Sequence, residues 1–153
     1  MLRNIITGSK TVEIYRVAND IKRGSVVTKN LNTKKADAAD GEGVQIYFLD
    51  KDSQPLGHLS DVEISGYDQS IDVVKADELA ILVKPALGTQ WGTDQVNGDF
   101  AVGDYAIAGT GANKGKLTKA ASGKVSTLKY IGSYDDNGHV LQVFEVVNPF
   151  TVV

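Results

Sequence analysis

Residues 109–116, with the sequence GTGANKGK, invite comparison with the glycine-rich loops that bind nucleotide phosphates. A P-loop has the spacing G-x-x-x-x-G-K-[ST], because its amides cradle the phosphates and its hydroxyl binds magnesium. In this chain Thr110 stands in place of the first glycine and Leu117 in place of the hydroxyl residue. A dinucleotide-binding fingerprint that starts at Gly109 also fails, since Lys114 occupies the position of its third glycine. The pattern predicts a hairpin loop and no nucleotide cofactor.

Asp50 and Asp52 begin a second pattern, because carboxylates two positions apart open the calcium loop of EF-hands. The match breaks at Pro55, where that loop requires glycine, and at Asp61, where it usually has a bidentate glutamate. Two further acidic groups are interpreted as turns in the same way: Asp68 with Asp72, and Asp135 with Asp136. A solvated turn is the prediction at each place, and no metal is expected.

The two histidines, His58 and His139, are far apart in the chain, and neither lies at the spacing of zinc ligands. Each follows a glycine, which is typical of the first residue of a strand after a turn. A catalytic triad would combine one of them with a serine and an aspartate from elsewhere, and the sequence has no G-x-S-x-G elbow and no cysteine. A small hydrolase that uses either histidine is one alternative. The prediction is a protein that is not an enzyme and has no catalytic residues.

The overall composition narrows the range of partners. The 153 residues suit one domain that buries about two-thirds of the surface of its unfolded chain. The net charge of −3 comes from interspersed residues of both signs, so nucleic acid is not an expected partner. The N-terminal residues lack the apolar run of a signal peptide, and no stretch approaches the roughly 20 apolar residues of a membrane helix. A membrane is therefore not expected as a partner either.

Short apolar runs that are rich in β-branched residues and bounded by Gly, Asn and Asp predict strands along most of the chain. These runs are 12–17, 25–28, 44–49, 62–65, 70–74, 79–84, 105–108, 116–119, 126–132 and 139–147. Residues 75–80 have some helical character but lead into a strand that Pro85 ends. The predicted fold is all-β, a small β-barrel or β-sandwich-like module with an extended apolar N-terminal arm and at most one short helix.

The arm is expected over residues 1–11, and residues 12–153 are expected to form a single β domain. The stretch 88–99 is the most loop-like, so two lobes of that domain would meet near it. Asn137-Gly138 predicts a hairpin with a type I′ turn. The strand that follows, 139–147, is apolar on both faces, which predicts a central strand or one covered by a partner.

Apolar residues near the two ends of the sequence, and the single tryptophan, are the candidates for an interface. The end segments have two interpretations, closing strands of the barrel or segments that order on a neighbouring molecule. Trp91 likewise suits either the core or an exposed interface anchor. The candidate interface residues are Leu2, Ile5, Ile6, Trp91, Phe150 and Val152.

The order of features along the chain carries a resemblance. An apolar start at 2–7 is followed by a Gly turn and Val-rich strand at 21–27, a Gly-Asp turn and strand at 103–108, and a turn at 121–125 before a Val-rich final strand. In this order the chain resembles the small capsid decoration, or cement, proteins and related minor head proteins of tailed bacteriophages.

The resemblance implies a non-catalytic virion protein, made in the host cytoplasm, that binds the capsid exterior and stabilises it by bridging subunits of the major capsid protein. It also implies a homo-oligomer, a trimer at symmetry axes being favoured, and no cofactor. One alternative is a head–tail connector, tail or fibre-base component. Another is a carbohydrate- or receptor-binding module that uses Trp91 and the tyrosines as stacking platforms.

Overall fold

The computed structural model describes residues 1–41, 45–51 and 72–153. Its strands are β1 (Leu2–Ile6), β2 (Lys10–Val17), β3 (Ile21–Lys22), β4 (Val26–Asn30), β5 (Lys35–Ala38), β6 (Tyr47–Asp50), β7 (Val73–Val74), β8 (Leu79–Pro85), β9 (Gln90–Thr93), β10 (Val96–Asn97), β11 (Tyr105–Ala108), β12 (Leu117–Lys119), β13 (Val125–Asp136) and β14 (His139–Thr151). Several predictions lie outside the described residues: the strand at 62–65, the start of the strand at 70–74, His58, Asp68, and the acidic loop from Asp52 to Asp61.

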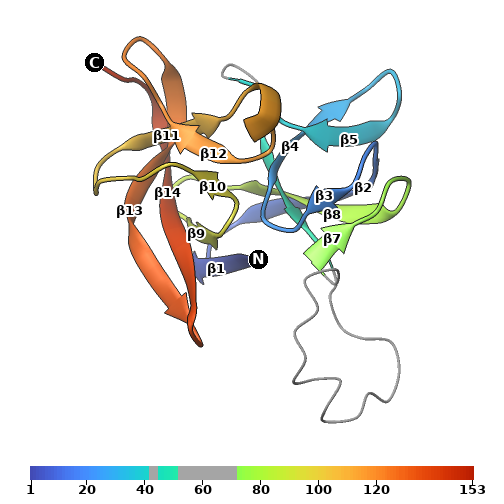
Figure 1. Ribbon diagram of the computed structural model, residues 1–153, viewed down its shortest axis with the longest axis horizontal. Coiled ribbons are helices and arrows are strands. Elements are labelled where there is room, and N and C mark those ends of the chain that lie inside the picture. Colours follow the sequence, from blue (N-terminus) through green and yellow to red (C-terminus); the bar gives the residue numbers. More distant parts are fainter. Residues whose placement is uncertain (42–44, 52–71) are drawn as a thin grey trace.

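The strands form two main bodies that lie side by side (Figure 1). Five strands close into a barrel in the order β2-β5-β4-β6-β8. A seven-stranded sheet has the order β1-β9-β14-β13-β11-β12-β10, and β3 pairs with β7 in a small separate sheet. The described helical turns are short, such as η2 (Gly111–Asn113), which lies in the predicted hairpin loop between β11 and β12. The predicted all-β fold is confirmed.

The barrel closes through antiparallel pairing of β2 with the full length of β8. Side chains alternate along β8, so that Ala80 and Leu82 are buried inside the barrel while Leu79 is exposed on its outside. The strand ends at Pro85, as predicted. The helical character of 75–80 is not realised, because this stretch turns into β8 through Asp77, which has a φ of 66°.

A second core lies between the barrel and the sheet and joins the two bodies. The ring of Trp91 on β9 stacks on Phe48 of β6, with ring centroids 5.8 Å apart. Its indole N–H donates a hydrogen bond to the hydroxyl of Thr89 at 2.9 Å, so the buried polar atom is satisfied. Because Trp91 is only 2% exposed, its interpretation as an exposed interface anchor does not hold and the core interpretation applies.

β9 is a strand in the middle of the sheet, although the sequence suggests a loop over 88–99. It pairs with β1 on one side and with β14 on the other. Glycine usually weakens a strand, but a Cβ at Gly92 would lie 3.3 Å from the Cβ of Leu141 on β14. The side chain of Leu141 occupies the space beside Gly92, so a larger residue there would have to displace it. The chain passes from the barrel to the sheet between Pro85 and Gln90.

β1 occupies the segment that was expected to extend as an arm. It pairs antiparallel with β9, from Leu2 opposite Thr93 to Ile6 opposite Gln90. Leu2 is buried in the core shared by the two bodies. The expected arm is corrected in this respect: residues 2–6 find their partner within the chain, because β9 offers an open edge and the shared core accepts Leu2.

The hairpin of β13 and β14 has the predicted turn, with positive φ angles of 55° at Asn137 and 87° at Gly138. β14 lies between β13 and β9, so the prediction of a central strand is confirmed. Both of its faces are covered within the chain. Phe144 is buried in the shared core, and Leu141 is buried on the opposite face beside Gly92.

Gly24 lies where the barrel contacts the N-terminal strand. Its φ is +89°, and a Cβ there would lie 2.4 Å from the carbonyl oxygen of Met1 and 2.6 Å from the hydroxyl of Thr93. That hydroxyl donates a hydrogen bond to the Gly24 carbonyl at 2.8 Å. Both the backbone angle and the packing therefore require glycine at this position.

Replacing Trp91 with alanine should lower the free energy of unfolding by about 3 to 5 kcal/mol, because it empties the core between the two bodies. Urea unfolding followed by far-ultraviolet circular dichroism measures the loss. Leu31→Ala is the control: Leu31 is exposed, and its truncation should change the free energy by less than about 0.5 kcal/mol. Equal effects of the two substitutions would contradict the shared core.

Gly24→Ala should destabilise the fold by about 2 kcal/mol or more, since a left-handed backbone angle and a steric clash add together. Gly98→Ala provides the matched control. Gly98 also has a positive φ, +84°, but a Cβ there meets no atom within 4 Å, so only the backbone strain of about 1 kcal/mol should appear. The difference in urea midpoint between the two variants measures the destabilisation that the clash with Met1 and Thr93 causes.

Candidate functional site

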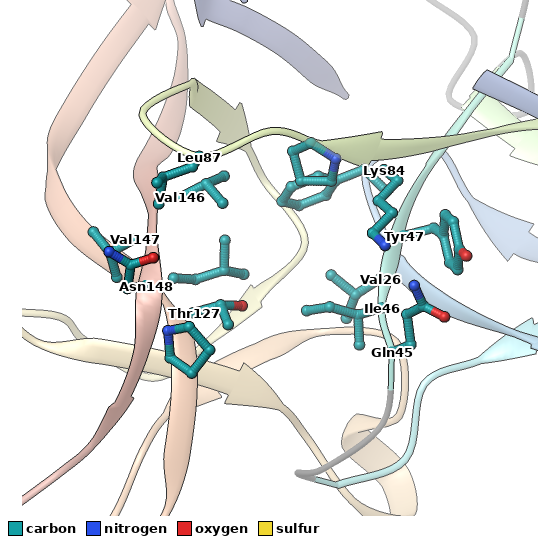
Figure 2. A pocket seen from close by; sticks show the side chains of 14 residues that line it. Val26, Gln45, Ile46, Tyr47, Lys84, Leu87, Thr127, Val146, Val147 and Asn148 are labelled. Atoms are coloured by element: carbon teal, nitrogen blue, oxygen red, sulfur yellow. The ribbon is translucent and has the colours of Figure 1, made fainter. Parts of the chain in front are cut away.

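A cleft of about 360 Å³ opens between the barrel and the sheet, beside the core that they share (Figure 2). The barrel wall of the cleft includes Ile46 and the end of β8, and the sheet wall includes Thr127 and residues 146–149. Its lining is mostly apolar, since Phe48 and other core residues form part of the surface. Its volume lies at the lower end of the range of about 300 to 1000 Å³ that is typical of ligand pockets.

A β-bulge shapes the sheet wall. Between two successive pairs of the β13–β14 ladder, β13 has the single residue Thr127, whereas β14 has three, residues 147–149. The hydroxyl of Ser126 accepts a hydrogen bond from the N–H of Leu128 at 3.1 Å, which satisfies a backbone group that the bulge removes from the ladder. Pro149 has no N–H to pair, so it is tolerated here. The bulge brings these three residues to the cleft.

Two of the 14 lining residues, Lys84 and Tyr47, carry titratable side chains. Within the described part of the chain the ammonium group of Lys84 has no ion-pair partner. The amides of Gln45 and Asn148 lie on opposite walls (Figure 2). One cation and two amides around an apolar floor can hold a ligand that carries an apolar group next to an acidic group. These three side chains do not form a pair of nucleophile and base.

Tyr47 also takes part in a second cluster, at the mouth of the barrel. The ammonium group of Lys29 lies 4.6 Å from the centroid of the Tyr47 ring and 5.5 Å from that of Tyr15, and it donates hydrogen bonds to Glu13 at 2.9 Å. Hydrogen bonds with Tyr47 and Glu13 raise the pKa of Lys29, because both stabilise its charged form. The lysine is held as a structural cation, since its charge is already paired.

Asp94 is the centre of a partly buried ionic cluster beside the tip of the β13–β14 hairpin. Its carboxylate accepts hydrogen bonds from the amino group of Met1 at 2.6 Å and from the Gln95 amide at 2.9 Å, and it lies 3.1 Å from Nε2 of His139. Burial acts to raise the pKa of Asp94, but the hydrogen bonds outweigh it and the pKa is lowered. The Asp94 carboxylate thus connects His139, the first residue of β14, to Met1, which precedes β1.

The remaining acidic residues of interest serve as structural partners. Asp50, the first residue of the calcium-like pattern, accepts a hydrogen bond from the guanidinium group of Arg23 at 2.6 Å. Asp135 accepts one from the N–H of Gly138, which is typical of a turn. Asp136 pairs with Arg3 of β1. No three acidic or histidine side chains of the described residues gather in a group that could hold a metal ion.

The predicted interface residues do not form one surface. Leu2 and Trp91 are buried, and Ile5 is half-buried beside Gly92, whereas Ile6 at the end of β1 is exposed. Leu2 on β1 and Trp91 on β9 enter the core between barrel and sheet, whereas Ile5 lies near Gly92 and Leu141. The candidates therefore divide between different surroundings.

The two candidates near the other end of the sequence, Phe150 and Val152, do not line the cleft. The exposed ring of Phe150 stacks on Tyr105 with centroids 4.7 Å apart. The N–H of Val152 donates a hydrogen bond to the carbonyl of Lys124 at 2.9 Å, so the segment continues the pairing with β13. Both candidates thus have partners within the chain, but these partners belong to the seven-stranded sheet and not to the barrel that the closing-strand interpretation named.

Apart from Pro149, which belongs to the apolar end segment, the cleft residues were not among the candidates from the sequence. Pro149 is the one local signal that could have indicated them, because a proline within a strand pattern marks an edge or a bulge. Lys84 and Leu87 carry no such signal, since they meet the bulge only through the packing of the two bodies.

Comparison with protein families, with curated proteins and with solved structures finds no significant match to this chain. Among the described residues, no helix is long and apolar enough to cross a membrane.

Because its folded-state pKa is lowered, Asp94 stabilises the fold above its ordinary pKa, and this contribution is lost as the pH falls through the lowered value. Asp94→Asn should therefore lower the free energy of unfolding at neutral pH by about 1 kcal/mol, a modest loss because partial exposure screens the cluster. The deficit should shrink below about pH 4. Asp99→Asn, at an exposed site, is the control, and a deficit that does not change with pH would contradict this role.

Proposed function

We propose that this chain is a non-catalytic structural protein that docks onto other protein subunits, and that an extended segment of the partner enters the cleft. The observation that carries the proposal is the character of the cleft: an apolar floor, with the ammonium group of Lys84 at its edge, which has no ion-pair partner among residues 1–41, 45–51 and 72–153. An apolar floor favours burial of aliphatic or aromatic side chains, and the ammonium group favours a carboxylate next to them. The partner segment thus combines apolar residues with Asp or Glu.

Several features suit an extended segment better than a compact ligand. The cleft lies between strands, and its sheet wall is a bulge, a feature that often stands next to binding sites because it redirects side chains. Its 360 Å³ has room for a few side chains. Leu87, which is 61% exposed on the rim, offers further apolar contact to such a segment.

The resemblance in sequence supports a particular setting for this docking, the exterior of a tailed-bacteriophage capsid. In that setting the partner is the major capsid protein, and the chain stabilises the shell by bridging neighbouring subunits. The compact all-β fold, with the ends of its sequence paired into sheets, suits a module that adds rigidity. The carbohydrate-binding alternative loses its main support, because Trp91 is buried and offers no stacking platform.

Lys84→Glu and Leu87→Asp should each weaken binding to shells that lack this protein by about tenfold or more, since they repel an acidic segment or remove apolar contact. Cosedimentation over a range of protein concentrations measures the affinity. Val102→Asp is the matched control, because Val102 is 75% exposed outside the cleft lining and should bind as the wild type does.

Two outcomes would overturn different parts of this proposal. If wild-type protein does not sediment with shells, the capsid setting fails. If it binds and both cleft variants bind equally well, the docking takes place elsewhere. Ring formation by the isolated wild-type protein would favour the connector or tail alternative.

A further inference from the structure

β14 is longer than the strand that pairs with it on one side. It has 13 residues, and β13 pairs with it from the hairpin turn to its last residue. On its other side β9 covers only residues 142–145, and hydrogen bonds between Val146 and the turn at 86–89 extend this contact by one residue. Among the described strands, none lies on that side of residues 147–151. We name this stretch the open edge.

The connection from barrel to sheet explains why the pairing stops at this point. Pro85 ends β8, and the N–H of Thr89 then donates a hydrogen bond to the carbonyl of Ala86 at 3.2 Å, which closes a turn directly before β9. The chain therefore arrives in the sheet beside Val146, and the rest of β14 lies past the start of its neighbour. Leu87, inside this turn, lines the cleft.

The backbone groups of Thr151 point to the open edge. The next residue, Val152, hydrogen bonds on the other side, since its N–H donates to the carbonyl of Lys124 and its carbonyl accepts from the N–H of Gly123. Successive residues of a strand direct their backbone groups to opposite sides, so the N–H and carbonyl of Thr151 point away from β13. Thr151 is exposed, and an incoming strand can therefore reach these groups.

The first part of the open edge is also the sheet wall of the cleft. Residues 147–149 line the cleft, and the amides of Asn148 and Gln45 lie on opposite walls (Figure 2). A side-chain amide has two donors and an acceptor, so it can bond either kind of backbone group of a peptide. A strand that pairs with the open edge would therefore lie in the cleft, between groups that suit a peptide backbone.

We infer that the partner segment binds as an added β-strand on the open edge, with alternate apolar side chains on the cleft floor and a carboxylate at Lys84. An unpaired strand edge is a template for another chain: main-chain hydrogen bonds supply affinity, and the cleft selects the side chains. The apolar floor receives every second side chain, because side chains alternate along a strand. This inference rests on the proposed function, since it specifies how the segment occupies the cleft.

The sequence of the open edge favours a different protein over a second copy of this chain. Residues 147–151 read VNPFT, so two open edges that paired with each other would bring no carboxylate to Lys84. Pro149 has no N–H to offer to such a pairing. A partner strand that contains Asp or Glu meets both the open edge and the ammonium group.

Hydrogen–deuterium exchange of the wild-type protein, free and bound to shells that lack it, tests the inference. Backbone amides of residues 147–151 should exchange at least about tenfold more slowly in the bound protein, because pairing with an added strand protects them. Residues 135–140, at the tip of the β13–β14 hairpin, are the internal control and should exchange equally in both states.

Thr151→Pro removes the N–H that points to the open edge and should weaken binding to the shells by about fivefold or more, because a backbone hydrogen bond to the partner is lost. Thr151→Val is the matched control, since it keeps the N–H and should bind as the wild type does. Cosedimentation measures both affinities, and thermal unfolding of the free variants separates weaker binding from loss of the fold.

The possible results separate this inference from the proposed function. If the wild type binds and Lys84→Glu binds weakly, but exchange at residues 147–151 is unchanged, strand addition is overturned and the proposed function stands. If the wild type does not bind the shells, the proposed function fails and takes this inference with it. Slow exchange at these residues in free protein with twice the mass of one chain would assign the open edge to a second copy and also overturn the inference.

Discussion

The apolar core shared by the barrel and the sheet is the constraint on which the rest of the structure depends. Phe48 comes from the barrel and Trp91 from the sheet, and their stacked rings fix the distance between the two bodies. Leu2 reaches the same core from β1, which explains why the first residues pair inside the chain. The cleft is the place where this core meets the surface, so its floor is apolar for the same reason that the two bodies stay together.

Outside the core, polar and charged groups form hydrogen bonds and ion pairs mainly with one another, and few of them line the cleft. The Ser126 hydroxyl accepts a hydrogen bond from the backbone N–H that the bulge leaves unpaired. Near the tip of the hairpin, the Asp94 carboxylate binds the amino group of Met1 and lies against His139. Most of the described cations are bound by carboxylates or aromatic rings, as Lys29 is. Lys84 is one of several described lysines without an ion-pair partner, and it differs from the others in lining the apolar cleft. An exposed lysine beside an apolar surface costs little free energy while it is hydrated, and under the proposed function a carboxylate of the partner would pair with it.

The two proposals divide the recognition of one segment between the two walls of the cleft. β8 would contribute the charge of Lys84 from the barrel, and β14 would contribute the open edge from the sheet. The strands of a closed barrel pair with one another on both sides, so the open backbone edge beside the cleft belongs to the sheet.

The sequence by itself determined the features that depend on neighbouring residues. Asn137-Gly138 specifies its turn, the apolar strand that follows is central as predicted, and residues 109–116 form a hairpin loop. It did not reveal β9, the burial of Trp91, the cleft or the open edge of β14. Those features arise from contacts between distant positions, such as Phe48 with Trp91, because the pattern of a single strand shows which faces are apolar but not what covers them. Only the packing of barrel against sheet decided which apolar residues were buried and which remained exposed.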